Sequence, residues 1–266
     1  MTTRITVGDV EIIALSDGDG ARPASWMFPD DGERAVEAYR DLLDADANVV
    51  LNFGCFLLRA DGKMVLVDAG NGPERGGSLL EQLVETGVRP DEIDLVLFTH
   101  LHGDHTGWNI DRATGEARFS RATYLVPRLD FDYYTSLESA SVARDIAPLA
   151  AFGALDLIEA ERALTPSLTT LAAPGHTPGH TGIAVTSQGR HALVIGDAFV
   201  SRISLAEPSW RVTADWDAEV AASTRRTLLE RADREGAVVA LSHLPAPGLG
   251  RFGTIEGDRR VWVPLG

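Results

Sequence analysis

The sequence predicts a fold in which α-helices and β-strands pack in layers, and three observations support this prediction. Short apolar runs of strand-like composition recur along the chain, and several of them end at a polar residue. One side of a helix expected over 78–86 carries Leu79, Leu80, Leu83 and Val84. Hydrophobic residues make up 44% of the 266 residues, which is enough to bury a substantial core between such layers.

The first half of the chain is expected to contain four strands and two helices. The strands span residues 5–15, 49–59, 63–68 and 93–99. Between the first two strands lies segment 17–48, rich in Gly, Pro and acidic residues, which we interpret as an insertion or lid. Its second part, 33–43, has a helical pattern, and the other helix is the one at 78–86.

The second half is expected to repeat this alternation of strands and helix. The strands span residues 168–172, 181–187, 190–196, 237–242 and 261–263. A helix over 217–235 precedes the fourth of them. Since no linker, low-complexity tract or strong internal repeat separates the two halves, we expect one domain over 1–266.

The most informative motif is a cluster that contains His100, His102, Asp104 and His105. Three imidazoles and a carboxylate within six residues are too polar to pack together as core side chains, but they can surround a metal ion. The apolar run 93–98 comes directly before the cluster. We therefore expect the cluster on a loop that leaves the C-terminal end of a buried strand.

Residues of the same kind follow later apolar runs. His176 and His180 lie in a loop stiffened by Pro and Gly, whereas Asp197 and His243 each follow an apolar strand. Strand ends of one sheet can converge on one point, which would bring these residues to the first cluster. Five candidate His ligands and two candidate Asp ligands are more than one four-coordinate metal needs, so we expect a two-metal site.

The order and spacing of these residues resemble those of the metallo-β-lactamase fold hydrolases. The HxHxDH signature of that family matches residues 100–105, its PGHTPGH-like segment matches 174–180, and the resemblance covers nearly the whole chain over 65–250. Stretches 207–217 and 243–250 resemble the branch that contains methyl parathion hydrolase and lactonase-like enzymes. The resemblance implies an α+β fold of four layers, the αββα sandwich, with two sheets between outer helices.

The resemblance also implies a role for each ligand. One metal would be held by His100, His102 and His176. The other would be held by Asp104, His105 and His243, with Asp197 and a hydroxide between the two metals. For Asp197 taken alone, a simpler role as a cap of the following turn stays open.

Two further residues are expected to support the ligands without binding metal. Asp68 matches a DxG turn of the family and is expected to orient a ligand, although a role as a turn-former before Gly70 is an equal alternative. His180 is expected to contact a ligand or to hold its own loop through a hydrogen bond.

The expected cofactor is a pair of divalent cations, with zinc as first choice and iron, manganese or cobalt as alternatives. Two such cations lower the pKa of a bound water, and the resulting hydroxide attacks an electrophilic carbonyl or phosphoryl centre. Asp104 and Asp197 are the expected catalytic residues, because one of them can relay a proton to the leaving group. The expected reaction is hydrolysis of a lactone, an aryl ester or a phosphotriester of a small hydrophobic substrate.

Other activities of the same fold stay open. A glyoxalase II-like thioesterase would need a basic clamp for a glutathione carboxylate, which the sequence does not reveal. A mononuclear-iron oxygenase would not need the second set of ligands. A nuclease of the ribonuclease Z type is opposed by the formal net charge of −15, because nucleic acid is also negative. We therefore expect a small-molecule substrate and no nucleic acid partner.

Aromatic residues near the cluster are expected to line the substrate pocket, since such pockets are mostly apolar. They are Trp26, Phe28, Trp108 and Phe199. Acyl-homoserine lactonases of the family typically place a Tyr, which contacts the lactone, three residues after the bridging Asp. Here that position is Val200, so the sequence leaves open whether lactonase activity survives without this tyrosine.

The remaining features favour a cytoplasmic protein without a membrane partner. No segment approaches the roughly 20 apolar residues of a membrane span. Cys55 is the only cysteine, so no intrachain disulfide can form, and its apolar neighbours predict a buried residue. The pair Arg225-Arg226 is expected on the solvated face of a helix. Likeness to the family suggests a homodimer.

Overall fold

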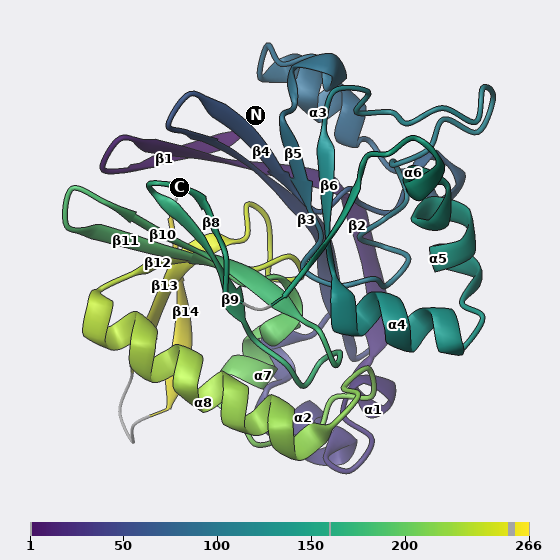
Figure 1. Ribbon diagram of the computed structural model, residues 1–266. Helices are drawn as coiled ribbons and strands as arrows, with labels where there is room; N and C mark the ends of the chain where they lie inside the picture. The colour runs from purple at the N-terminus through teal and green to yellow at the C-terminus, as the bar shows by residue number, and fades with distance from the viewer. Residues whose placement is uncertain (1, 160, 255–258, 266) are drawn as a thin grey trace.

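The computed structural model describes residues 2–159, 161–254 and 259–265, and it confirms the αββα order of layers. Two seven-stranded sheets lie face to face, with helices on their outer sides (Figure 1). The first sheet contains β1 (Thr3–Val7), β2 (Val10–Pro23), β3 (Asn48–Ala60), β4 (Lys63–Val67), β5 (Leu95–Leu97), β6 (Thr123–Pro127) and β7 (Leu155–Ile158). The second contains β8 (Ala163–Thr165), β9 (Leu168–Ala172), β10 (Thr181–Ser187), β11 (Arg190–Val194), β12 (Val238–Ala240), β13 (Leu249–Thr254) and β14 (Arg260–Pro264).

The direction of the strands determines where the loops meet. In the first sheet β1 to β4 are antiparallel, and β4 to β7 are parallel. In the second sheet β11 and β12 run parallel, whereas their neighbours pair antiparallel. Parallel neighbours such as β4 and β5 end at the same edge of the sheet, so the segments that follow them are brought together there.

Apolar residues alternate between two sides of each sheet. In β4, Val65 and Val67 belong to the core between the sheets, whereas Leu66 belongs to the core beneath the outer helices. Phe56 and Leu57 of β3 divide in the same way. Both sheets are therefore covered on both faces, as the long apolar runs in the sequence require.

The helices form three groups. The first sheet is covered by α3 (Leu79–Glu85), α4 (Arg128–Ser136), α5 (Ala140–Asp145) and α6 (Ala147–Ala151). The second is covered by α8 (Ala218–Glu235), and α1 (Ala24–Met27), α2 (Gly32–Ala38) and α7 (Arg202–Ala206) share a separate apolar cluster. Short 3₁₀ segments are η1 (Arg40–Leu42), η2 (Pro73–Arg75), η3 (Pro90–Glu92) and η4 (Gly196–Ala198). The predicted helices at 78–86 and 217–235 are confirmed, and the one at 33–43 corresponds to α2 and η1.

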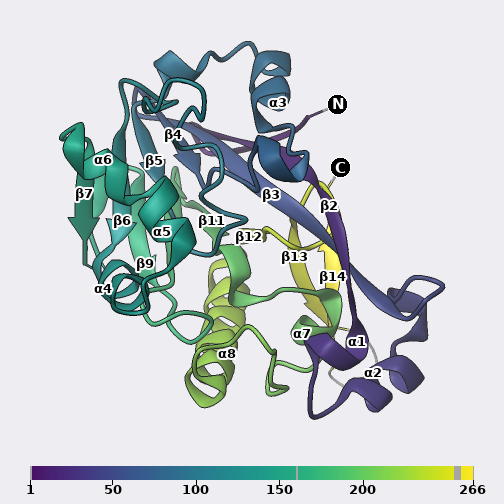
Figure 2. The same cartoon turned by 90° about the vertical axis from the view of Figure 1, so that its right-hand side faces the viewer.

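The N-terminal prediction of one strand over 5–15 is wrong. The chain turns after β1 at Gly8, whose φ of +60° suits glycine, and returns as β2. Strand β2 then continues to Pro23 and pairs with β3 up to Asn48, so the first part of segment 17–48 is strand. Figure 2 shows β2 and β3 extending together to α1 and α2. This extension overhangs the edge where the candidate ligands lie.

The sequence patterns do not predict the elements between β5 and β9. Strands β6, β7 and β8 have five, four and three residues, and α4 to α6 have nine or fewer. Elements this short leave too few periods for a pattern to be recognised. They matter because α4 carries two residues that contact the candidate site.

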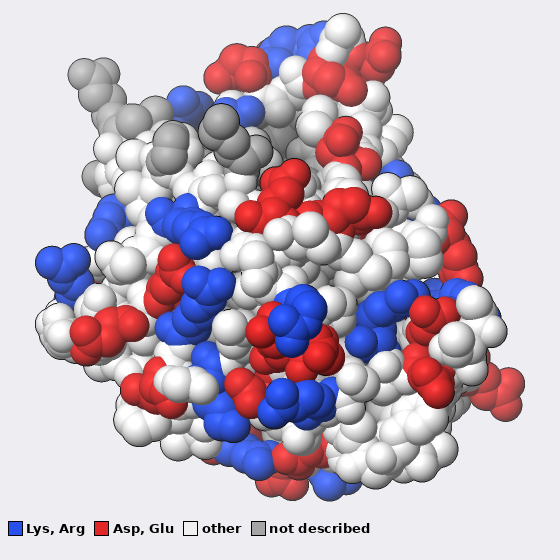
Figure 3. Space-filling model, turned by 90° about the horizontal axis from the view of Figure 1, so that it is seen from above, with Lys and Arg blue, Asp and Glu red and all other residues white. Residues whose placement is uncertain are grey.

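The surface carries charges of both signs (Figure 3). On the face shown in Figure 3, Lys and Arg side chains lie among Asp and Glu, without a broad positive area. Within the described residues no helix combines the length and apolar character needed to cross a membrane. Cys55 is buried, as predicted.

Candidate active site

Seven predicted ligand residues meet where the two sheets open toward the β2–β3 extension. The segment after β5 supplies His100, His102, Asp104 and His105, and the loop after β9 supplies His176. Asp197 lies in η4 after β11, and His243 follows β12. Residues far apart in the sequence are thus brought within ligand distance of one another, as predicted.

The first group of candidate ligands is made of His100, His102 and His176. The distance from His102 Nδ1 to His100 Nε2 is 3.0 Å, and that to His176 Nε2 is 3.2 Å. Ligands bound at about 2.0–2.1 Å in a tetrahedral zinc site lie roughly 3.3 Å apart. The three nitrogens therefore have the separation that a shared metal ion requires.

A second group is made of Asp104, His105 and His243. Oδ2 of Asp104 lies 3.5 Å from Nε2 of His243 and 3.8 Å from Nε2 of His105. These three atoms can hold a second cation, because they combine two imidazole nitrogens with a carboxylate oxygen.

Asp197 lies between the two groups. Its Oδ2 is 2.8 Å from Nε2 of His243, 3.5 Å from Nε2 of His105 and 3.5 Å from Nε2 of His176. It also lies 3.8 Å from Nε2 of His100, so one carboxylate oxygen faces imidazoles of both groups. A carboxylate in this position could bridge two cations, one in each group.

Unpartnered atoms test whether metal ions fit. Nε2 of His105 and Oδ1 of Asp197 are buried and have no hydrogen-bond partner among the described residues. A buried polar atom without a partner costs about 1–3 kcal/mol, and a cation would satisfy both of these. The donor set and its spacing thus support two divalent cations, as expected, and zinc remains the proposal for their identity.

Hydrogen bonds on the outer side orient several ligands. Asp68 accepts bonds from the backbone and hydroxyl of Thr99 at 2.7 and 2.8 Å and lies 2.9 Å from Nδ1 of His105. Nδ1 of His243 lies 2.8 Å from the carbonyl oxygen of Asn52. These contacts leave Nε2 of both histidines to face the centre, and the expectation that Asp68 orients a ligand stays a prediction.

His102 and His176 have outer partners that the sequence analysis missed. The hydroxyl of Tyr134 lies 2.8 Å from Nε2 of His102, so Nδ1 of that ring faces the centre. Nδ1 of His176 lies 3.5 Å from Oδ1 of Asp215. Both carboxylate oxygens of Asp215 accept hydrogen bonds of 2.8 Å from Arg225.

Arg225 is fully buried, so its prediction as a solvated residue is wrong. Beyond its bonds to Asp215, its guanidinium donates to the carbonyl oxygens of Ala198 and Trp210. Burial of a guanidinium requires such a complete set of acceptors. Its helical spacing could have indicated the buried face of α8, because Ala221, Leu228 and Arg225 share that side.

Asp130 of α4 joins the two loops that carry the first group. Its carboxylate accepts hydrogen bonds from the backbone of Leu101 and Gly179 and from the hydroxyl of Thr177. Burial raises the pKa of Asp130 to about 6. His180 lies beside the cluster and accepts a hydrogen bond of 3.2 Å from the backbone of Asp197.

Burial and the neighbouring imidazoles and carboxylates shift the pKa values of the cluster residues. Burial alone would raise the pKa of Asp197, but the imidazoles of His243 and His105 hold it well below its usual range. Burial, together with neighbouring His176, lowers the pKa of His102 to about 3. Burial also acts to lower the pKa of His105, yet the carboxylates of Asp197 and Asp68 raise it overall. Ionised carboxylates and a neutral His102 are the forms that bind cations.

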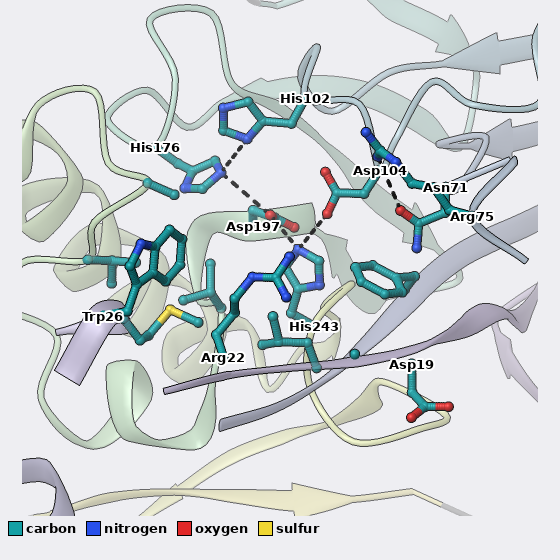
Figure 4. A pocket seen from close by; sticks show the side chains of 17 residues that line it. Asp19, Arg22, Trp26, Asn71, Arg75, His102, Asp104, His176, Asp197 and His243 are labelled. Atoms are coloured by element: carbon teal, nitrogen blue, oxygen red, sulfur yellow. Dashed lines mark hydrogen bonds and ion pairs between the residues drawn. The ribbon is translucent and has the colours of Figure 1, made fainter. Parts of the chain in front are cut away.

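A cavity of about 540 Å³ opens above the cluster (Figure 4). We call its cluster side the floor, which comprises His102, Asp104, His176, Asp197 and His243. We call the rest the wall, which comprises Asp19, Gly20, Arg22, Trp26, Met27, Leu51, Phe53, Asn71, Arg75, Val200, Val212 and Ala214. The wall is mainly apolar, which suits an organic substrate above a polar floor.

One of the four aromatic residues predicted for the pocket lies there. Trp26 lines the cavity, but the predictions for Phe28, Trp108 and Phe199 are wrong. Phe28 packs on Trp210 in the cluster of α1, α2 and α7, and Phe199 packs on Phe252 in the core beneath α8.

Trp108 is held away from the cavity by a buried carboxylate. Its Nε1 donates to Asp17, which also accepts from the backbone of Gly72 and Leu79. Val200 does line the cavity, so an aliphatic side chain stands where acyl-homoserine lactonases typically have Tyr.

Comparison with known families agrees with this geometry. A family model described as the metallo-beta-lactamase superfamily matches residues 55–243. The chain belongs to the metallo-beta-lactamase superfamily. The match contains all seven residues of the cluster, and the predicted class, a metal-dependent hydrolase, is confirmed.

Two relatives are about a quarter identical to this superfamily member over the residues that align. N-acyl homoserine lactonase AiiA of Bacillus thuringiensis subsp. kurstaki is 24% identical over 213 residues, which are 71% of this chain and 80% of the relative. N-acyl homoserine lactonase AiiB of Agrobacterium fabrum is 28% identical over 183 residues, 62% of this chain and 64% of the relative.

Solved structures match over the whole chain. AidC, a dizinc quorum-quenching lactonase in complex with a product, has a TM-score of 0.86 at 23% identity and covers 100% of this chain and 97% of its own. The hydrolase AbOPH of the beta lactamase superfamily has a TM-score of 0.86 at 25% identity with the same coverage. These matches confirm the fold predicted from the sequence.

Proposed function

We propose that this protein is a dinuclear metal-dependent hydrolase that opens the ring of a lactone. The observation that carries the proposal is the position of Asp197, whose Oδ2 lies within 3.8 Å of imidazoles from both groups at the base of the cavity. Relatives named as lactonases, AiiA and AiiB, favour a lactone as the substrate. AbOPH, named as a hydrolase, leaves esters and phosphotriesters as related substrates to test.

Two bound cations would supply a water-derived nucleophile near neutral pH and polarise the carbonyl under attack. One would be held by His100, His102 and His176, and the other by Asp104, His105 and His243. Asp197 would join the two and keep the groups at a constant separation.

Asp104 is the residue we assign to proton transfer. Its side chain is 26% exposed and lines the cavity, whereas that of Asp197 is 3% exposed. Burial opposes its ionisation, but the imidazoles of His105 and His243 lower its pKa overall. Its carboxylate can therefore accept a proton beside the reacting carbonyl and deliver it to the leaving alkoxide.

A substrate panel combined with metal analysis tests this function. Protein purified without chelator should contain about two metal ions per chain and hydrolyse a γ-lactone faster than an aryl ester, a phosphotriester or a glutathione thioester. Two bound metals without lactone or ester hydrolysis would contradict the proposal. Preference for the thioester would favour a glyoxalase II-like enzyme, and one iron with oxygen consumption would favour an oxygenase.

A further inference from the structure

Two arginine side chains in the wall have no carboxylate partner among the residues that the structure describes. Arg22, on the β2 extension, and Arg75, at the end of η2, both line the cavity above the cluster. Within the described residues neither forms an ion pair, although Arg59, Arg112 and Arg260 each lie within 4 Å of a carboxylate. Other arginines of the described residues, such as Arg190 and Arg226, also lack an ion pair, but only Arg22 and Arg75 combine this with a place in the cavity wall.

Arg75 lies against the metal-binding loop itself. A Cβ atom placed on Gly103 would be 3.3 Å from both terminal nitrogens of Arg75. Gly103 stands between His102 and Asp104, so the guanidinium occupies space that a side chain in this loop would otherwise fill. Its one hydrogen bond is a long contact of 3.4 Å to Asn71, which leaves most of its donors free.

Arg22 reaches the cavity from the β2 extension. Its one hydrogen bond is to the carbonyl oxygen of the preceding residue, Ala21, and its side chain extends toward the floor in Figure 4. Asp19, the acidic residue of the wall, points away from Arg22 and from the labelled floor residues in the same view. Among the described residues, no carboxylate lies within ion-pair distance of either guanidinium, so both can pair with an anion in the cavity.

We propose that the substrate of this site carries an anionic group, such as a carboxylate, at a distance from the bond that is hydrolysed. This inference rests on the proposed hydrolase function and narrows its substrate class. The reacting carbonyl would lie at the floor, the aliphatic part against Trp26, Met27 and Leu51, and the anion at Arg22 and Arg75. Guanidinium groups bind carboxylates through paired donors and give both affinity and selectivity.

Two lactones that differ at one end test the proposal. N-hexanoyl-homoserine lactone ends in a methyl group, and N-adipoyl-homoserine lactone has the same number of acyl carbons but ends in a carboxylate. We expect the metal-loaded enzyme to show a higher kcat/KM for the adipoyl lactone by about tenfold at low ionic strength, and this preference should shrink as salt is added.

Substitution of the arginines should remove the preference. In Arg22→Gln and Arg75→Gln the ratio of kcat/KM between the two lactones should fall, and in the double variant it should fall by about tenfold. Arg121→Gln, which removes an exposed arginine outside the cavity, is the control for a change in net charge. An equal or lower kcat/KM for the adipoyl lactone, or a ratio unaffected in the double variant, would overturn the proposal.

A binding measurement separates this inference from the hydrolase function. Calorimetric titration of the metal-loaded protein should show tighter binding of adipate than of hexanoate, with the difference lost in the double variant. If neither lactone is hydrolysed but this difference is found, the lactonase function fails and the anion site stands. If both lactones are hydrolysed but adipate and hexanoate bind equally, the anion site fails and the hydrolase stands.

Discussion

The floor and the wall of the cavity are built in different ways. Floor residues such as His176 and Asp197 are at most 3% exposed, and most of the imidazoles have an outer partner that fixes the ring. Wall residues such as Trp26, Arg22 and Arg75 are exposed and form few hydrogen bonds. If the proposed function is correct, buried contacts fix most of the metal ligands, whereas exposed residues of the wall can change without disturbing them.

Their positions in the fold explain this difference. The floor lies on segments that leave buried strands of both sheets, and these strands are covered on each face. Most of the wall comes from the β2–β3 extension, α1 and the segment of η2, whereas Val200, Val212 and Ala214 come from the segments around α7. Substitutions in the floor should therefore have larger effects than substitutions in the wall.

The largest expected effect is that of Asp197→Asn. Outer partners of metal ligands typically contribute 10–100-fold in activity, so loss of a bridging carboxylate should lower kcat by about 10³-fold. Lactone hydrolysis and bound metal would be measured together, with His191→Asn, outside the cluster, as the control. Retained turnover would show that Asp197 is not the bridge.

The second largest effect is expected at Asp215, which contacts the floor residue His176. Asp215→Asn leaves the buried charge of Arg225 without its ion pair, so we expect a loss of about 3–5 kcal/mol in the free energy of unfolding. Because Asp215 also contacts His176, metal affinity should fall by about 10–100-fold.

Urea unfolding and metal titration would measure these changes. Asp233→Asn is the matched control, because Asp233 pairs with Arg260 on the surface and should contribute less than about 1 kcal/mol. Equal destabilisation by the two substitutions would mean that the buried pair gives the floor no special support.

Asp130 should make stability depend on pH. Its carboxyl has a pKa near 3.8 when unfolded and about 6 when folded, because burial disfavours the charged form. The folded state binds this proton more tightly, so Asp130 should lower the free energy of unfolding by about 3 kcal/mol as the pH rises from about 4 to 7. In Asp130→Asn this contribution is absent, so the stability of the variant relative to wild type should rise over that range.

The measurement is urea unfolding of chelator-treated protein at several pH values. Asp94→Asn provides a control of opposite sign, because the pKa of Asp94 is lowered in the folded protein by its bonds to Met64 and Lys63, which outweigh burial. A difference between Asp130→Asn and wild type that stays constant with pH would contradict the expected coupling.

The smallest effect is expected in the wall. Trp26→Ala removes an aromatic side chain that is 47% exposed, so KM for a lactone should rise by about fivefold with little change in stability. Trp216→Ala is a matched control, since Trp216 is 48% exposed and does not line the cavity. Equal effects of both substitutions would show that Trp26 does not contact the substrate.

The sequence predicts the floor better than the wall for a physical reason. Ligands such as His100 and Asp104 lie in a short motif, and each later ligand follows an apolar strand, so local patterns are sufficient to find them. The outer partners Tyr134 and Asp215 have no local pattern, because their contacts depend on how α4 and the segment before α8 pack.

The aromatic residues show most clearly which contacts a local sequence pattern does not predict. Phe28 and Phe199 lie near the site in sequence, but the fold uses them to fill apolar cores, where large side chains contribute most. Trp108 is turned away because Asp17 accepts its indole hydrogen. Which face of a segment meets the cavity is determined by packing over long sequence distances, and proximity in the sequence does not reveal it.

Each candidate metal group draws its members from both sheets. His100 and His102 follow a strand of the first sheet and His176 a strand of the second, and the other group divides in the same way. An ion held by either group would therefore link the two halves of the molecule, in addition to the apolar core and the hydrogen bonds between them. Removal of the metal ions by a chelator should make local opening of the two halves easier. The rate of amide hydrogen exchange should then rise at the ends of both β5 and β12.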